Sequence, residues 1–239
     1  MGLWLRGFID STGILTRFFV GFLSFAFIAW VMLANFEPAS TYGVNRWSLY
    51  LAVVVALGLV GGLLFCLCDL IAVYAAMLGG LGGLAIGLWV LGWRDNLSIT
   101  SAWGRAVLLC LLALVGFLWA AYSVNASILG SAFAGSYVLM LGLDVYFHTG
   151  FTYCATTVLD ANPAHAHTYV VYRETYIMQG IIILAFIVGF ISQIIQRSLL
   201  TIQSHFDHPP VYLRSFKYGM RERWNPFGPP AAVAVAPPP

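Results

Sequence analysis

Long apolar stretches separated by short polar interruptions run through most of this sequence. Between Ser48 and Trp93 the chain carries a single formal charge, Asp69, near the middle. The stretches on either side of it, Tyr50–Leu67 and Leu70–Leu91, are each long enough to cross a hydrocarbon core of about 30 Å at about 1.5 Å of helix rise per residue. The link between them leaves room only for a tight turn. The pattern therefore predicts back-to-back membrane helices.

Extended over the whole chain, the same pattern predicts an all-α, polytopic integral membrane protein whose helices form Gly-rich hairpins. We expect a short N-terminal segment at 1–12, a transmembrane helical domain at 13–197, and a basic, then Pro-rich tail at 198–239 that is cytoplasmic and disordered. The segment 148–175 is expected to lie partly in the membrane interface. Six spans are predicted, at about residues 13–33, 50–67, 70–91, 106–122, 126–147 and 176–196.

Composition supports the membrane class and narrows the partners. The chain is 61% hydrophobic and 8% charged, against about 25% charged in soluble domains. Its net charge is only +2, and its basic residues form no groove with interleaved aromatics, which argues against nucleic acid as a partner. The expected partners are the lipid bilayer and other membrane proteins.

The distribution of Lys and Arg predicts that both termini are cytoplasmic, because basic residues collect on the cytoplasmic side of a membrane protein. The side with the termini holds Arg6, Arg17, Arg197, Arg214, Lys217, Arg221 and Arg223, and the opposite side holds Arg46, Arg94, Arg105 and Arg173.

The motifs of soluble enzymes do not occur in this sequence. It contains no GxxxxGK[ST] loop, no GxSxG elbow and no HExxH helix, so we expect no catalytic residue and no cofactor. His165 and His167 with Asp160 have the residue types of a metal site, as do His205, Asp207 and His208. Neither group has a tight ligand set, so we interpret these histidines as surface residues and predict no metal.

Small residues recur within the predicted spans at positions that suit helix packing. Gly79, Gly80, Gly82 and Gly83 lie in the third span, and Ser131 and Gly135 lie four residues apart in the fifth. Lipid supplies no hydrophobic driving force between membrane helices, so close backbone approach at small residues holds them together. We predict that these six residues pack helices.

Asp144 is the most informative polar position, because an acid within a membrane span is costly unless it is paired. It lies near the end of the fifth span and shares a helix face with His148. One interpretation is a structural ion pair with Arg105, Arg94 or Arg173, all predicted on the same side of the membrane. The other is an ion or proton site. Asp144, His148 and Arg105 are therefore the candidate intramembrane polar site.

Two motifs around this acid carry a resemblance to a known family. The segments Gly130–Tyr137 and Gly142–Phe151, with Trp103-Gly104-Arg105 and with Gly189 and Gln193, resemble the transmembrane-protein-198 / seven-transmembrane-superfamily-member-3 domain family, in particular its fungal-type members. The resemblance extends over roughly Gly13 to Gln196. Family members have seven spans. Six are predicted here, so either this member lacks the first span or the gene model is truncated.

The resemblance implies a multi-pass membrane protein without established catalytic activity, whose animal relatives are linked to signalling. We therefore expect a non-enzymatic membrane organiser or signalling scaffold. The alternative is a small-solute or ion transporter or channel that uses Asp144. None of the ten prolines lies in a predicted span, so the chain lacks the Pro-broken helices found in many transporters.

Overall fold

A computed structural model describes residues 2–37, 45–67, 71–162, 165 and 169–207 of the chain. The predicted turn at Asp69, together with Cys68, His167, His208 and the tail beyond it, lies outside these residues. The chain divides into two units, Met1–Ile194 and Ile195–Pro239. The described residues of the second unit continue the last helix of the first.

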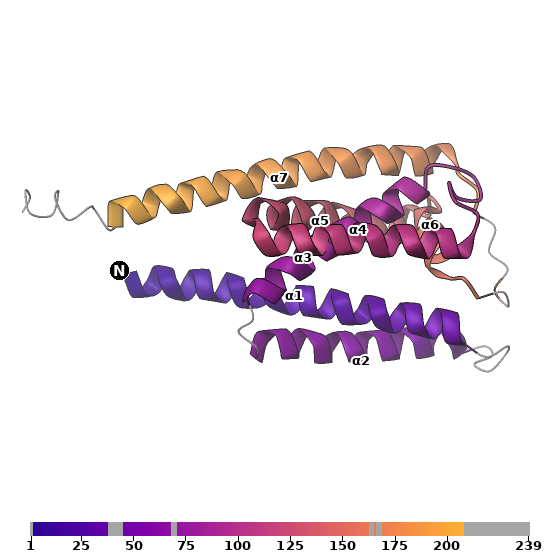
Figure 1. The fold of residues 1–239 in the computed structure, drawn as a ribbon, viewed down its shortest axis with the longest axis horizontal. Helices are drawn as coiled ribbons and strands as arrows, with labels where there is room; N and C mark the ends of the chain where they lie inside the picture. Colours follow the sequence, from indigo (N-terminus) through magenta and orange to yellow (C-terminus); the bar gives the residue numbers. More distant parts are fainter. Residues whose placement is uncertain (1, 38–44, 68–70, 163–164, 166–168, 208–239) are drawn as a thin grey trace, which may run out of the picture. The chain divides into compact units, whose positions relative to one another are not determined.

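The described residues form helices and no strand, which confirms the all-α prediction (Figure 1). Six of the seven helices are long and apolar enough to cross a membrane, as predicted, and the exception is α6. The helices are α1 (Gly2–Phe36), α2 (Arg46–Leu67), α3 (Ile71–Leu91), α4 (Ala102–Tyr122), α5 (Val124–Phe147), α6 (Phe151–Leu159) and α7 (Arg173–Asp207).

The helices differ from the hydropathy prediction most at the beginning of α1, at the end of α7 and in the segment between α5 and α7. Helix α1 begins at Gly2, so the predicted segment 1–12 is part of the same helix as the first span, and α7 runs past residue 196 to Asp207. Helix α6 lies in the segment expected at the interface. Nine residues of helix rise only about 14 Å, too little to cross a bilayer, so a search for spans passes over it.

Glycines set the distance between the helices that pack most closely. A Cβ atom at Gly82 in α3 would lie 2.3 Å from the Cα of Gly130 in α5, and one at Gly79 would lie 2.2 Å from the carbonyl oxygen of Gly116 in α4. Gly83 is as crowded, with the Leu112 carbonyl oxygen at 2.1 Å. The backbones of α3, α4 and α5 therefore approach where no side chain fits.

The other two glycines expected to pack helices differ from these. A Cβ atom at Gly80 would lie 3.6 Å from its nearest neighbour, in ordinary van der Waals contact. A Cβ atom at Gly135 would have nothing within 4 Å. The glycine pattern in the sequence therefore marks both crowded and open positions.

The most buried side chains gather where α3 ends and α7 begins. The carbonyl oxygen of Gly92, directly after α3, accepts hydrogen bonds from the Tyr169 hydroxyl at 3.0 Å and from Gln179 Nε2 of α7 at 2.6 Å. A Cβ atom at Gly92 would lie 2.6 Å from Cys154 Sγ of α6. The end of α3 is thus joined to two elements far from it in sequence. The fully buried side chains include Tyr169, Phe151, Leu91, Ile182, Gln179, Thr175 and Cys154.

Replacing Gly82 with alanine should destabilise the protein, because the new methyl group would overlap the backbone of α5. Overpacking of this kind costs about 1–3 kcal/mol. Gly135→Ala is the matched control. It adds the same methyl group into open space and should leave stability unchanged or slightly raised, since alanine is the better helix former. Thermal unfolding of the two variants in detergent checks this, and equal melting temperatures would contradict the packing role of Gly82.

Candidate functional site

Helix α6 is short, buried and poorly supplied with caps of its own. Phe151 and Cys154 have no exposed surface, and Val158 has 4%. The residue before the helix, Gly150, adopts a left-handed conformation with φ of 82° and has no side chain to cap the helix. The free amides at the start of α6 and the free carbonyls at its end therefore need partners from other helices.

Asp144 provides the cap at the start of α6. Its side chain lies in the last turn of α5 and its residue is 5% exposed. One carboxylate oxygen accepts hydrogen bonds from the backbone amide of Thr149, at 2.8 Å, and from the Thr149 hydroxyl. The other oxygen accepts from the backbone amide of Thr152 at 2.6 Å. A negative charge at this end also interacts favourably with the helix dipole.

Arg105 and Asn35 provide the partners at the opposite end of α6. Arg105 of α4 is 9% exposed, and its Nη1 donates to the carbonyl oxygen of Thr157 at 2.9 Å. Asn35 of α1 donates from Nδ2 to the carbonyl oxygen of Leu159, also at 2.9 Å. A cation at the C-terminal end of a helix is again the favourable arrangement. Helix α6 is thus capped by side chains from α1, α4 and α5.

The three residues of the candidate polar site do not meet in one place. Asp144 and Arg105 hold opposite ends of α6, and the partners of the Asp144 carboxylate are threonine groups rather than an arginine. His148 ends α5 in a left-handed conformation and is exposed; its Nδ1 lies 3.1 Å from the carbonyl oxygen of Tyr146. Asp144 and His148 both belong to the corner between α5 and α6, whereas Arg105 belongs to α4.

Ser131 makes a polar contact between helices. Its hydroxyl group lies 2.9 Å from Oε1 of Gln193 in α7 and 2.9 Å from the carbonyl oxygen of Ile128 in its own helix. It therefore takes part in a side-chain contact between α5 and α7.

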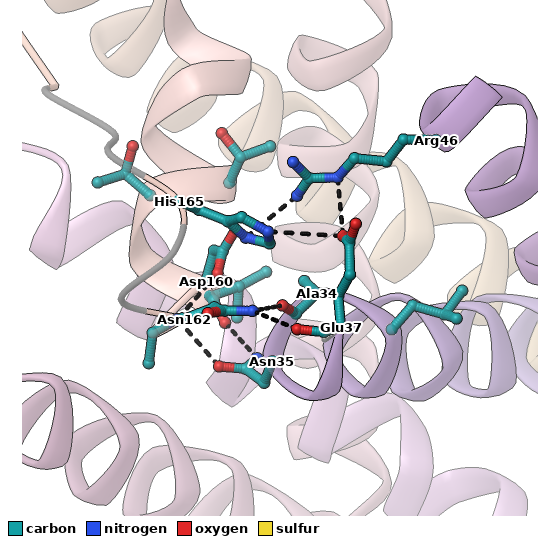
Figure 2. A network of polar contacts seen from close by, with 12 residues as sticks. Ala34, Asn35, Glu37, Arg46, Asp160, Asn162 and His165 are labelled. Atoms are coloured by element: carbon teal, nitrogen blue, oxygen red, sulfur yellow. Dashed lines mark hydrogen bonds and ion pairs between the residues drawn. The ribbon is translucent and has the colours of Figure 1, made fainter. Parts of the chain in front are cut away.

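A second polar group, here called the polar clasp, consists of Asn35, Glu37, Arg46, Asp160, Asn162 and His165. Figure 2 shows the Glu37 carboxylate facing both Arg46 and His165. Its Oε2 lies 2.9 Å from Arg46 Nε and 3.5 Å from His165 Nε2, and it accepts a hydrogen bond from the Tyr50 hydroxyl. His165 Nδ1 lies 2.7 Å from Asp160 Oδ2. Charged groups from α2, the end of α1 and the segment after α6 thus meet at one point.

The two asparagines of the polar clasp join α1 to the segment after α6. Asn162 donates from Nδ2 to the carbonyl oxygens of Glu37 at 3.1 Å and Ala34 at 3.3 Å (Figure 2). Asn35 Oδ1 accepts from the backbone amide of Ala161 at 2.9 Å. Asn162 thus satisfies the carbonyl of Ala34 in the last turn of α1 and that of Glu37 just after the helix.

Sequence reasoning missed Glu37 and placed His165 wrongly. The side chain of His165 is 7% exposed, so it is not a surface histidine. Glu37 and Arg46 flank the connection between the first two spans, and an acid and a base at the two ends of one short connection are the signal that could have revealed their pairing. Within the described ranges no group of three or more His, Cys, Asp or Glu is arranged to hold a metal ion.

The buried thiol and phenol groups beside α6, those of Cys154 and Tyr169, are poor nucleophiles. Burial raises the pKa of the Cys154 thiol to about 12, and burial also raises the pKa of Tyr169. A thiol is a poor nucleophile until it ionises. Cys154 therefore acts as a small apolar core residue.

Comparison with known proteins places this chain in a family. The model of the TM7S3/TM198-like domain matches residues 14–194, a range that includes α6, Asp144, Arg105 and the polar clasp. No curated protein and no solved structure matches the chain.

Asp144→Asn should destabilise the protein although it keeps the size of the side chain. Bonds to a charged acceptor are worth about 1.5–3 kcal/mol, and an amide nitrogen in place of one oxygen would face a backbone N–H rather than accept from it. We expect a loss of about 2 kcal/mol, measured by thermal unfolding in detergent. His148→Asn is the control, since that side chain is exposed. An unchanged melting temperature for Asp144→Asn would contradict the capping role.

Cys154 should resist alkylation in the folded protein at about pH 9, where an ordinary thiol is largely ionised. The raised pKa keeps it protonated and the core covers it, whereas Cys66 lies at the end of α2 and is partly exposed. Mass spectrometry after brief treatment with a membrane-permeant maleimide should find Cys66 modified and Cys154 unmodified. Modification of both at similar rates would show that the core around α6 opens readily.

Proposed function

The chain belongs to the TM7S3/TM198-like domain family, and on that basis we propose that it is a non-enzymatic membrane organiser or signalling scaffold. Its six apolar helices are consistent with an integral multi-pass membrane protein. The proposal assigns the membrane domain the task of holding other membrane proteins together. We further propose that both termini lie in the cytoplasm, as the distribution of Lys and Arg favours.

The hydrogen bonds of Asp144 are the observation that carries this proposal. A carboxylate that bound a transported ion or proton would have to exchange its partners during each cycle. Asp144 instead accepts three hydrogen bonds from Thr149 and Thr152. One of the donors is the backbone amide of Thr152 in the first turn of α6, and another is the backbone amide of Thr149 just before that helix. Releasing them would expose the end of a buried helix. The geometry therefore favours a fixed structural acid over a transport site.

An uncovered face of α5 supports a role in holding partners. Gly135 and Gly142 have nothing within 4 Å of a Cβ position, and Leu139 and Tyr146 beside them are 54% and 81% exposed. These four residues follow one another at spacings of four, three and four, so they lie on one helix face. A helix of another membrane protein could approach the α5 backbone closely there.

Replacing Gly135 and Gly142 with larger residues should change which membrane proteins lie next to this protein. A labelling enzyme fused to the C-terminal end of the full chain is expected to mark a reproducible set of membrane neighbours. Gly135→Leu with Gly142→Leu should reduce that set severalfold without loss of the folded protein, because both positions have room. Ala121→Leu, a similar enlargement at an exposed position on α4, is the matched control. The absence of reproducible neighbours would count against a scaffold.

A flux measurement tests the rival transport function. Purified protein in liposomes should move no ion or small solute beyond the level of empty liposomes, with or without Asp144→Asn. Flux through the wild-type protein that Asp144→Asn abolishes, while the variant remains folded, would overturn the scaffold proposal in favour of a transporter or channel.

A further inference from the structure

Helix α7 is longer than a membrane crossing requires. Its 35 residues rise about 52 Å at about 1.5 Å per residue, whereas the hydrocarbon core is about 30 Å thick. The candidate span within it ends at Leu199, and the helix continues to Asp207. The last turns of α7 therefore carry the chain out of the membrane, on the side proposed to be cytoplasmic.

The sequence beyond Asp207, which lies outside the described residues, contains the motif Asn225-Pro226-Phe227-Gly228. Its order is the one that type I β-turns favour, with Asn at the first position, Pro at the second and Gly at the fourth. Each residue has a physical reason, because an Asn side chain bonds to the backbone of such a turn and Pro fixes one dihedral angle in advance. The motif therefore favours a turn with one large apolar side chain, that of Phe227.

The distance along the chain makes this motif accessible to a soluble domain. At up to about 3.5 Å per residue, the sequence between Asp207 and Asn225 can extend over several tens of ångströms. The turns of α7 that follow Leu199 add to this separation from the lipid. A folded domain in the aqueous phase can therefore bind the motif without approaching the bilayer.

The residue types of the motif define the pocket that would recognise it. An aromatic side chain in an apolar pocket is a typical anchor of a small interface. The amide of Asn225 has both donors and acceptors, so polar groups at the rim of the pocket can fix the orientation of the turn. Arg221 and Arg223 precede the motif and suit an acidic surface beside the pocket. A sequence that favours the bound turn also lowers the entropy cost of binding.

A second pattern overlaps the first. Pro226 and Pro229 have the PxxP spacing, with Arg223 three positions before it. Domains that bind PxxP take it as an extended polyproline helix. Gly228, inside this spacing, has the greatest conformational freedom of any residue and so opposes a preformed extended helix. The sequence therefore favours recognition as a turn.

We propose that Asn225-Pro226-Phe227 is a docking motif for a cytoplasmic adaptor domain that has an apolar pocket for the phenylalanine ring. Helix α7 presents the motif outside the membrane, and the tail recruits the soluble partner while the open face of α5 holds membrane proteins. This inference rests on the proposed function, because it assigns the scaffold a soluble partner and depends on the proposed orientation of the termini.

The test uses the full chain in phosphatidylcholine nanodiscs. The probe is a purified, fluorescent EH domain, a soluble module that binds Asn-Pro-Phe peptides. Binding to the wild-type chain should be saturable, and Phe227→Ala should weaken it at least about tenfold, because aromatic anchors are costly to truncate. Phe216→Ala is the matched control, since it makes the same change in the same tail outside the motif and should leave the affinity unchanged.

Three results would overturn the proposal. The first is no saturable binding to the wild-type chain, or equal weakening by Phe227→Ala and Phe216→Ala. The second is binding that is lost when the nanodiscs contain phosphatidylserine, which would assign the basic and aromatic tail to an anionic membrane surface. The third is an SH3 domain that binds more tightly than the EH domain and is lost in Pro229→Ala but not in Phe227→Ala, which would assign the tail to a PxxP-binding partner.

Proximity labelling separates this inference from the scaffold proposal on which it rests. Phe227→Ala should remove soluble neighbours and keep the membrane neighbours, whereas Gly135→Leu with Gly142→Leu should do the reverse. Soluble neighbours that persist in Phe227→Ala would overturn the docking motif alone. Absent membrane neighbours together with intact binding of the EH domain would count against the membrane scaffold alone.

Discussion

The arrangement at one end of this membrane domain depends on a single constraint: a helix end that is withdrawn from water must find its hydrogen-bond partners inside the protein. The ends of helix α6 meet this constraint through side chains of other helices. Asp144 of α5 accepts from the Thr152 amide in its first turn, while Arg105 of α4 and Asn35 of α1 donate to carbonyls in its last turn. Three spanning helices are therefore positioned by a helix of nine residues. The charges follow the direction of the helix dipole, with the acid at the start and the base at the end.

Two kinds of contact hold the helices together: close packing at glycines and hydrogen bonds between polar side chains. Glycines bring backbones together within the α1–α2 pair, where a Cβ atom at Gly21 would lie 2.4 Å from the Gly61 carbonyl oxygen, and within the group of α3, α4 and α5. Polar side chains of the clasp join the α1–α2 pair to the end of α6 and the segment that follows it. Apolar cavities, rather than glycine contacts, lie between α1 and the group of α3, α4 and α5. Glycine packing is thus local to each group, whereas the clasp connects elements that are far apart in sequence.

This division explains what could be predicted from the sequence. Hydropathy is a property of consecutive residues, so the six spans were predictable, and so was the cost of an acid such as Asp144 within one of them. The hydrogen-bond partners of Asp144 were not predictable. Helix α6 is too short for a hydropathy signal, and Thr149 and Thr152 carry no charge that would mark them as partners of an acid. Arg105 reaches a carbonyl 52 positions away and Asn35 one 124 positions away. Contacts at such separations depend on how the helices associate, which spacing along the chain does not encode.

The contrast between Asp144 and Arg105 shows how a charged residue in a membrane helix is best interpreted. Both are buried, and the sequence favoured Asp144 as the functional residue because an intramembrane acid is expensive. The relevant question is which hydrogen bonds each charged side chain makes within the protein. Asp144 accepts three donors from the corner that follows it. Arg105 leaves Nε without a partner among the described residues, at a cavity that it shares with Asp160. Arg105 donates Nη1 to the Thr157 carbonyl oxygen at the other end of α6. Both charges are therefore explained by the helix ends that they cap, and both residues belong to the architecture.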